Sequence, residues 1–265
     1  MNVNINEIVE LIKVTAQTVL MPYFTDVERS YKADGSVITK ADHQMQSTIK
    51  NQLYRLYPDY LLLGEEMTEE EQKAILCSGR PVWCLDPLDG TNNFSTGIPY
   101  SSVSLALISE GCVVLGIVYD PFRDECFYAS EQQQSCINGK PLQLIESHLT
   151  LKQSIAIVDF KRLSHQLATR LVTGNPYSSQ RSFGSVALDW CWLAAGRGHL
   201  YLHGRSNIWD YAAGHYIFTR AGGYSSTLEG EPVFKDKLEP RSIVAAADES
   251  LFNDWRHWLT GAISD

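Results

Sequence analysis

The sequence predicts a layered α/β protein in which helices and sheets alternate through one body. Two amphipathic helical patterns open the chain, short apolar runs bounded by Gly, Pro or Asp follow, and strand and helix patterns alternate beyond residue 150. The first half, about residues 1–140, therefore predicts helices on a sheet (α+β), and the second, about 141–265, predicts alternating α/β structure. The halves join around residues 130–150. A prior of about 150 residues per domain allows one large domain or two fused halves.

The first half begins with apolar residues at spacings of three and four, which predict two helices. The first spans Ile5 to Leu20 and stops at Pro22, and the second spans Met45 to Leu56 and ends before Pro58. Short apolar runs then predict strands at residues 61–63, 82–85, 103–108 and 113–118. Glu110 and Gly111 fit a hairpin turn between the last two strands. Two helices should therefore cover one face of a sheet.

The second half follows another turn, at Asn138 and Gly139, and alternates between strand and helix patterns. The expected strands are residues 155–158, 199–202 and 243–246, and the expected helices are residues 163–172, 186–195, 211–221 and 251–259. Gly222 and Gly223 should close the third of these helices, because glycine commonly ends a helix. The two halves are expected to pack as one layered body.

The composition is that of an ordinary globular protein. Hydrophobic residues make up 44% of the 265 residues and charged residues 20%, which disfavours disorder, collagen and coiled coil. The 22 basic residues against 31 acidic ones give a net charge of -9. That balance disfavours broad binding to nucleic acid or to anionic membranes.

The predicted location is the cytoplasm. No apolar run approaches the roughly 20 residues that cross a bilayer. The N-terminal segment lacks a basic start and carries Glu7, Glu10 and Lys13 among its apolar residues, unlike a secretory signal. The six cysteines are irregularly spaced, contain no C-x-x-C and fall mostly in apolar segments, which is typical of buried thiols in a reducing compartment.

Three acidic clusters lie where predicted strands end or predicted helices begin. They are Gly64-Glu65-Glu66, Asp86 to Thr91 (DPLDGT), and Trp209-Asp210. In open α/β sheets the loops at the carboxyl ends of strands form the ligand crevice, so acids arriving there from separate segments can converge. Each cluster alone has an ordinary explanation: a solvated loop, two consecutive turns and a helix N-cap. Their positions together favour a shared site.

The middle cluster suggests a metal and phosphate site. Pro87 fixes a turn that lets Asp86 and Asp89 point the same way, and two facing carboxylates repel unless a cation lies between them. Oxygen ligands without a nearby His or Cys favour Mg²⁺ over Zn²⁺. The backbone N–H groups of Gly90 and Thr91, at a helix start, would donate to an adjacent anion. Paired carboxylates beside backbone donors suggest a phosphate ester as substrate.

The motifs resemble those of the inositol monophosphatase family, a superfamily of Mg²⁺-dependent, lithium-sensitive phosphatases. Residues 83–94 (WCLDPLDGTNNF) resemble its D-P-[IL]-D-G-T-x-N-F signature, and residues 34–42 (DGSVITKAD) resemble its D-x-V-T-x-x-D segment with one extra residue. Residues 64–66 match its G-E-E element, and residues 208–223 match its W-D-x-A-A-G…A-G-G element. The resemblance covers nearly the whole chain in order. It implies a single phosphatase domain over residues 1–265, built as a layered αβαβα sandwich.

The resemblance also implies the metal ligands and the catalytic residues. One Mg²⁺ would be held by Glu65, Asp86 and the backbone carbonyl of Leu88, and a second by Asp86, Asp89 and Asp210; a third, weaker ion would lean on Glu65 and waters. Two neighbouring Mg²⁺ ions of this kind bind a phosphate between them, activate water and stabilise the leaving alkoxide. Thr91, hydrogen-bonded to Asp42, would orient the attacking water together with Glu65. Positioning and charge compensation would then carry catalysis, without a phosphoenzyme.

Substrate recognition is where this sequence departs from the family. Family members commonly carry an acidic residue seven positions before the W-D aspartate, which grips inositol hydroxyls, and His203 occupies that position here. His203 and Arg205 would suit a second anionic group, because Arg offers planar charged donors to phosphate. Residues 182–187 resemble a G-[ST]-A substrate-wall element, with Val186 in place of the usual small residue. The expected substrate-binding residues are Gly90, Thr91, Gly184, Ser185, His203, Arg205 and Asp210.

The sequence leaves several functions open. The leading one is a Mg²⁺-dependent phosphomonoesterase acting on a small phosphorylated metabolite, with inositol monophosphate as first candidate and a homodimer as the expected assembly. Within the same superfamily, fructose 1,6-bisphosphate, 3'-phosphoadenosine 5'-phosphate, NADP and histidinol phosphate remain alternatives. A protein-binding module that keeps the phosphatase fold is an alternative of another class. The complete acidic set, with Thr91, argues for an enzyme.

Overall fold

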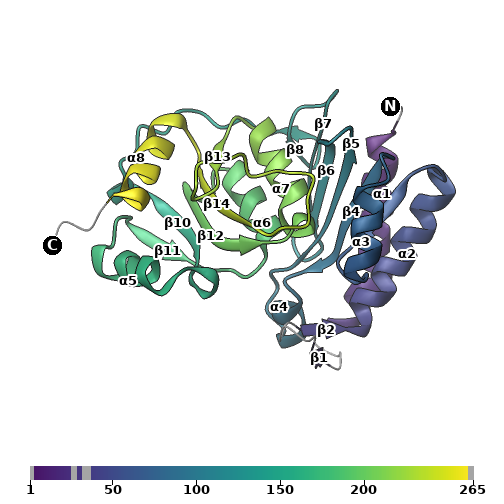
Figure 1. The fold of residues 1–265 in the computed structure, drawn as a ribbon. Coiled ribbons are helices and arrows are strands. Elements are labelled where there is room, and N and C mark those ends of the chain that lie inside the picture. The colour runs from purple at the N-terminus through teal and green to yellow at the C-terminus, as the bar shows by residue number, and fades with distance from the viewer. Residues whose placement is uncertain (1–2, 25–28, 32–36, 262–265) are drawn as a thin grey trace.

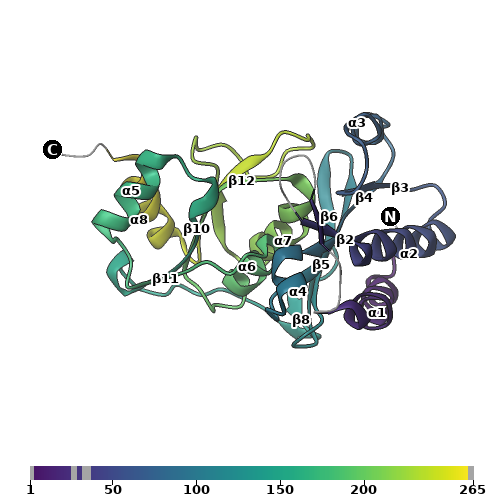
Figure 2. The ribbon, with the colours of Figure 1, turned by 90° about the horizontal axis from the view of Figure 1, so that it is seen from below.

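In the computed structural model, a large sheet and a smaller sheet stand apart with helices between them and on both outer sides. Figures 1 and 2 show this succession from the N-terminal helices to the C-terminal helix. The structure describes residues 3–24, 29–31 and 37–261. The αβαβα layering expected from the resemblance is therefore confirmed.

The large sheet belongs to the first half of the chain. Its strands, in spatial order, are β3 (Leu61–Gly64), β4 (Val82–Asp89), β5 (Ser102–Ser109), β6 (Cys112–Asp120), β7 (Glu125–Ser130), β8 (Cys136–Ile137) and β9 (Lys140–Pro141). β3 and β4 are parallel, and the following pairs are antiparallel. The predicted hairpin turn between β5 and β6 is confirmed: Glu110 and Gly111 both have positive φ angles, 52° and 73°, as a tight two-residue hairpin requires.

The outer layer on the large sheet is formed by α1 (Ile5–Thr15) and α2 (Lys40–Leu56). Their buried stripes, which include Ile8, Ile12, Met45 and Ile49, pack on the sheet around Trp83. The first helical segment passes Pro22, because a π-helical turn (Ala16–Leu20) leads into a 3₁₀ turn (Met21–Tyr23). Proline is tolerated there, at the start of a new turn. The strands β1 (Arg29–Tyr31) and β2 (Val37–Thr39) pair ahead of α2, and α3 (Glu69–Leu76) follows β3.

The smaller sheet belongs to the second half. Its strands, in spatial order, are β11 (Ser179–Arg181), β10 (Ile155–Asp159), β12 (Leu200–Ser206), β14 (Arg241–Ala246) and β13 (Tyr224–Ser226). β10 is parallel to both of its neighbours, whereas β14 is antiparallel to β12 and β13. The outer helices α5 (His165–Gly174) and α8 (Glu249–Thr260) cover this sheet, with Leu171 and Trp255 in the shared core. The short turns η3 (Leu151–Gln153) and η4 (Phe160–Arg162) flank β10.

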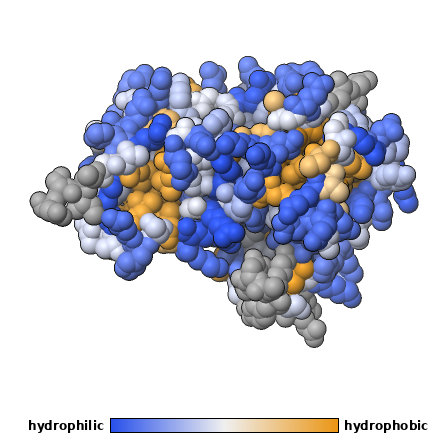
Figure 3. Space-filling model, in the orientation of Figure 1, coloured by the Kyte–Doolittle hydropathy of each residue, from blue (hydrophilic) through white to orange (hydrophobic). Residues whose placement is uncertain are grey.

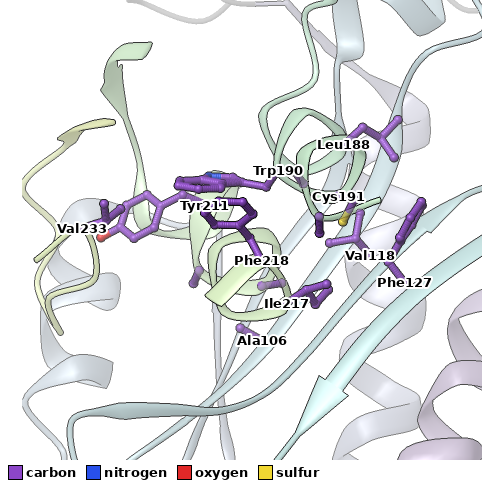
Figure 4. Packing of buried hydrophobic residues seen from close by; sticks show 14 of the residues in the cluster. Ala106, Val118, Phe127, Leu188, Trp190, Cys191, Tyr211, Ile217, Phe218 and Val233 are labelled. Carbon is purple, nitrogen blue, oxygen red and sulfur yellow. The ribbon is translucent and has the colours of Figure 1, made fainter. Parts of the chain in front are cut away.

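The central layer consists of α6 (Val186–Ala194) and α7 (Ile208–Arg220), between the two sheets. Trp190 of α6 packs against Phe218 of α7 with ring centroids 5.1 Å apart (Figure 4). A Cβ on Gly116 of β6 would lie 2.8 Å from the carbonyl oxygen of Ala213. The absence of a side chain at Gly116 therefore lets α7 lie close to the large sheet. The short helix α4 (Thr91–Thr96) follows β4 in the chain.

Hydrophilic residues cover most of the face seen in Figure 3, and two larger hydrophobic areas appear on it, one in the left half and one right of the centre. Within the described ranges, no helix combines the length and apolar character that crossing a bilayer requires. All six cysteines are free thiols; Cys84, Cys126, Cys136 and Cys191 are buried, and Cys77 and Cys112 are exposed.

Candidate active site

A pocket of about 240 Å³ opens where the two sheets and the central helices meet. Its walls come from the ends of β3, β4, β10 and β12 and from the beginnings of α4, α6 and α7. The acidic residues on these walls are Glu65, Asp86, Asp89, Asp159, Asp189 and Asp210. Segments separated by more than a hundred residues thus bring their carboxylates to one place.

A bulge in β4 makes Asp86 and Asp89 neighbours. Residues three apart in a regular strand point to opposite faces, but the register of β4 against β5 shifts between these two positions. A β-bulge of this kind redirects the following side chain. The backbone N–H of Leu88 donates to Asp86 Oδ1 at 3.0 Å, and this local hydrogen bond stabilises the bulge. Both carboxylates consequently line the same pocket, as the Asp-Pro-Leu-Asp sequence predicts.

Asp89 is held by the second half of the chain. Its Oδ2 accepts hydrogen bonds from Ser185 Oγ at 2.6 Å and from the backbone nitrogen of Ala187 at 2.7 Å, at the start of α6. Burial raises the pKa of Asp89 to about 6, although these hydrogen bonds act in the opposite direction. The carboxylate is oriented by α6 and at the same time destabilised as an anion by its surroundings.

Asp210 stands in the first turn of α7 and completes a capping box with Asn207. Its Oδ2 accepts from the backbone nitrogen of Asn207 at 2.8 Å, so its ordinary role as a helix cap is real. It also faces the other acids of the pocket. Burial, with the charges of Glu65 and Asp89, raises the pKa of Asp210 to about 8. Asp210 therefore both caps α7 and contributes a carboxylate to the pocket.

Glu65 follows β3 directly, and its backbone nitrogen donates to the carbonyl of Leu85 at 3.3 Å, which keeps it beside β4. A Cβ on Gly64, the residue before it, would lie 2.3 Å from Gln46 Oε1, so a larger residue there would displace the Gln46 side chain. That same oxygen accepts from the backbone nitrogen of Glu66 at 3.3 Å. The Gly-Glu-Glu element is thus anchored to α2 by Gln46, which places Glu65 on the pocket wall.

The acidic side chains of the pocket repel one another. Burial and the neighbouring carboxylates, Glu65 first among them, raise the pKa of Asp86 well above its ordinary value. Within the described ranges, no group of three or more Asp, Glu, His or Cys side chains already has the spacing of a complete metal site. The donors expected to bind a metal are nonetheless all hard oxygens: the carboxylates of Glu65, Asp86, Asp89 and Asp210 and the carbonyl of Leu88. Such a set suits Mg²⁺, which accepts carboxylate ligands together with waters and substrate oxygens.

Thr91 begins α4 and is linked to α2. Its Oγ1 lies 3.2 Å from Asp42 Oδ1 and 2.9 Å from the carbonyl of Leu88. Asp42 is buried, and its Oδ2 accepts from the backbone nitrogen of Thr39 at 2.8 Å. Burial raises the pKa of Asp42, while its hydrogen bonds with Thr39 oppose the shift. The predicted Thr91–Asp42 contact is therefore present. Of the segment 34–42, the residues Asp34, Gly35 and Ser36 lie outside the described residues.

Two glycines allow the two halves to meet beside Thr91. Gly90 has φ +89°, and a Cβ there would lie 3.1 Å from the carbonyl oxygens of Gly184 and Tyr100. Gly184 has φ +87° and faces Asn93, whose Nδ2 donates to the carbonyl of Phe183 at 2.6 Å. Gly90, Gly184 and Ser185 all line the pocket, where they were expected.

The two residues expected to select the substrate have different positions. His203 lines the pocket but is only 3% exposed, because its Nε2 lies 3.0 Å from Asp159 Oδ2. Its Nδ1 accepts from the backbone nitrogen of Arg205 at 3.3 Å, so the ring proton resides on Nε2. Arg205 lies outside this pocket and lines a neighbouring one with Trp209 and Asp236. The structure therefore does not bring Arg205 together with the acidic cluster.

Some residues of the pocket wall escaped the sequence reasoning: Asp159, Lys161, Arg162, Asp189 and Asn207. A signal existed for Asp159, because it directly follows the predicted strand 155–158 and so sits at the kind of strand end that carries the other acids. Asp189 gave no such signal, since it lies inside an apolar helix. Its carboxylate accepts from the hydroxyl of Tyr100 at 3.1 Å, and burial raises its pKa well above the ordinary value.

Comparison with known proteins agrees with this geometry. The sequence profile of the inositol monophosphatase family matches residues 3–262. An inositol monophosphatase 1 of Solanum lycopersicum is 34% identical over 73% of this chain and 72% of its own length. A protein named Nus factor SuhB from Pasteurella multocida is 32% identical over 84% and 82%. The crystal structure of the extragenic suppressor protein suhB from Bartonella henselae has a TM-score of 0.85 and 28% identity over 98% of this chain and 99% of that one. The chain belongs to the inositol monophosphatase family.

Proposed function

We propose that this protein is a Mg²⁺-dependent phosphomonoesterase that hydrolyses a small phosphorylated metabolite, with inositol monophosphate as the first candidate. The observation that carries the proposal is the convergence of Glu65, Asp86, Asp89 and Asp210 on one pocket, next to the Thr91–Asp42 hydrogen bond. A pocket of about 240 Å³ suits a metabolite rather than a polymer. Phosphatases of this family depend on Mg²⁺.

Four of the six acidic residues of the pocket have a place in the proposed metal site. Glu65, Asp86 and the carbonyl of Leu88 would hold one Mg²⁺, and Asp86, Asp89 and Asp210 would hold a second, with a third, weaker ion beside Glu65. Bound Mg²⁺ supplies Lewis-acid polarisation of the phosphate and lowers the pKa of water. The raised pKa values of Asp86, Asp89 and Asp210 support this assignment, because divalent cations relieve repulsion among buried carboxylates.

The chain's own residues would orient the nucleophile and the substrate. Glu65 and the Thr91 hydroxyl would hold the attacking water, and Asp42, as acceptor from Thr91, would fix the direction in which that hydroxyl points. Gly90, Gly184 and Ser185 line the space beside them without bulky side chains. Positioning of this kind lowers the barrier by removing the entropic cost of bringing water and phosphate together.

Other substrates of the superfamily remain candidates within this proposal. His203 occupies the position at which the family commonly carries an acid, and it is engaged by Asp159. Sugar bisphosphates, 3'-phosphoadenosine 5'-phosphate, NADP and histidinol phosphate therefore belong in the test beside inositol phosphates. A second function, as a protein-binding module, is favoured by the similarity to a relative named Nus factor SuhB.

The proposal extends to assembly and location. We expect residues 1–265 to fold as a single phosphatase domain and to form a homodimer in the cytoplasm, with lithium sensitivity as in the family. The six free thiols are consistent with a reducing compartment. Sedimentation of the purified protein measures the assembly, and lithium titration of phosphate release measures the inhibition.

Phosphate release from the substrate panel, with and without Mg²⁺, tests the proposal. The Asp89→Asn variant keeps one side-chain oxygen that can accept from both Ser185 and Ala187, so it should fold. Its turnover should fall more than about 100-fold, which exceeds the usual loss when a hydrogen-bond partner of a metal ligand is removed. Asp254→Asn, an exposed position on α8, is the matched control. If the protein hydrolyses none of the substrates in the panel, the proposed enzymatic function is contradicted. If a cellular phenotype survives Asp89→Asn, the cellular role is binding.

A further inference from the structure

The turn η4 (Phe160–Arg162) is fixed against the pocket by three contacts. Asp159, at the end of β10, accepts from the backbone nitrogen of Lys161 through Oδ1 at 2.8 Å and from His203 Nε2 through Oδ2 at 3.0 Å. Gly204 lies against the same turn: a Cβ there would lie 1.9 Å from the carbonyl oxygen of Arg162. The backbone of this turn is therefore set by the His203–Asp159 hydrogen bond on one side and a close glycine contact on the other.

This turn brings the basic residues to the pocket. Among the described residues that line it, the basic side chains are Lys161 and Arg162, and both are exposed. None of the ion pairs found within the described ranges uses either of them. Arg162 interacts electrostatically with Asp159 and with Asp210. Two cations thus border an acidic pocket, and neither is held in one of these ion pairs.

The cations and two of the proposed metal ligands come from different sheets. Asp86 and Asp89 end β4 in the large sheet, whereas Lys161 and Arg162 follow β10 in the smaller sheet, with the central helices between the sheets. A substrate whose scissile phosphate lay against the acids and their Mg²⁺ would extend toward η4. An anionic group there would meet an ammonium and a planar guanidinium, which form strong charge-assisted hydrogen bonds with phosphate and carboxylate.

We propose that Lys161 and Arg162 form a second anion-binding subsite, so that the preferred substrate is a small phosphate monoester bearing another phosphate or a carboxylate. This inference rests on the proposed phosphatase function and names its substrate class. It also assigns a role to His203 and Gly204: they are positioning residues, which hold the turn that presents the two cations. The second anion is met by Lys161 and Arg162 rather than by Arg205, which lines another pocket.

Matched substrates that differ only by the second anion test the subsite. Fructose 1,6-bisphosphate is compared with fructose 1-phosphate, and phosphoglycolate with 2-hydroxyethyl phosphate, so that the two pairs separate phosphate from carboxylate recognition. The measured quantity is the ratio of kcat/KM within each pair, for the full-length protein with Mg²⁺. In the wild type we expect at least one ratio of about tenfold or more, equivalent to about 1.4 kcal/mol.

The variants Lys161→Gln and Arg162→Gln, alone and together, should bring that ratio toward one. Arg162→Lys keeps the positive charge, so this variant should retain part of the wild-type preference for the substrate with the second anion. Lys140→Gln, an exposed position in β9 away from the pocket, should leave the ratio as in the wild type. A wild-type ratio near one in both pairs, or a ratio that the double variant does not change, overturns the subsite while the phosphatase stands.

A binding measurement separates failure of the subsite from failure of the enzyme. If no substrate is turned over, the phosphatase proposal fails, and calorimetry of fructose 1,6-bisphosphate with the Mg²⁺-supplemented protein decides the subsite. Binding that weakens about tenfold or more in the double variant supports it. Equal binding by the wild type and the double variant, or no binding by either, overturns it.

Discussion

The Oδ2 atom of Asp89 lies 2.7 Å from the backbone nitrogen of Ala187, which joins the bulged end of β4 to the first turn of α6 across 98 residues of sequence. The same oxygen accepts from Ser185. One carboxylate therefore connects the two halves of the chain at the pocket. Its orientation depends on the packing of α6 between the sheets, so changes in the second half should alter a proposed metal ligand in the first.

Removal of the Ser185 hydroxyl tests this connection. Ser185→Ala leaves the Ala187 N–H in place but removes the 2.6 Å hydrogen bond, so Asp89 should be less well oriented and harder to ionise. We expect Mg²⁺ affinity to fall about 10–100-fold, as is usual when a ligand's hydrogen-bond partner is lost. Titration of the melting temperature with Mg²⁺ measures the affinity. Ser185→Thr, which keeps a hydroxyl, is the control, and equal affinity in all three proteins contradicts the connection.

Mg²⁺ should stabilise the fold itself. The crowded carboxylates oppose folding when ionised, and a cation that binds only the native state relieves them. At a Mg²⁺ concentration of about 100 times Kd the gain is about 2.7 kcal/mol, which raises the melting temperature by several degrees. Chelation should reverse the rise. The same ionic strength supplied by KCl is the control, and a flat melting temperature across millimolar Mg²⁺ leaves the metal assignment without support.

Thr91 should affect turnover more than binding. Its hydroxyl lies between Asp42 and the Leu88 carbonyl, where it is proposed to hold the attacking water. Thr91→Ala is expected to lower kcat by about 10²-fold or more, within the range for positioned groups in proton transfer, with little change in KM. Thr91→Ser keeps the hydroxyl and should recover most of the rate. Equal kcat in both variants would show that the hydroxyl has no part in the reaction.

The site was more predictable from the sequence than its surroundings. Asp86 and Asp89 could be placed together because Pro87 restricts the backbone between them and Gly90 permits the unusual backbone angle that follows. Glu65 could be placed because it directly follows a strand. Those signals are local. The contact between Thr91 and Asp42 came from the resemblance, since 49 residues separate them and no local pattern links them.

The substrate side of the pocket was less predictable for the same reason. Arg205 is two residues from His203 along the chain, yet it lines a different pocket. The register of β12 shifts between His203 and Ser206, the stretch that contains Arg205. Lys161 and Arg162 line the acidic pocket, and their turn lies against two residues some forty positions away: Gly204 approaches the carbonyl of Arg162, and His203 contacts Asp159. Only the packing of β10 beside β12 brings these segments together.

Half-buried His215 should make stability depend on pH. Its Nε2 lies 3.0 Å from Ser225 Oγ, its ring packs 5.1 Å from Trp190, and burial lowers its pKa to about 4 from an ordinary 6.5. Between these values the unfolded chain binds more protons than the folded one, so the stability contributed by this residue rises with pH. It is fully present above about pH 6.5 and is lost as the pH falls toward 4.

The His215→Gln variant isolates this contribution, because glutamine retains a polar group near Ser225 but does not titrate. Urea unfolding of both proteins between pH 4 and pH 7 gives the difference in free energy of unfolding. The wild type should gain stability relative to the variant as the pH rises, by at most about 1.4 kcal/mol per pH unit. A difference that stays constant over this range would mean that His215 titrates alike in the folded and unfolded states.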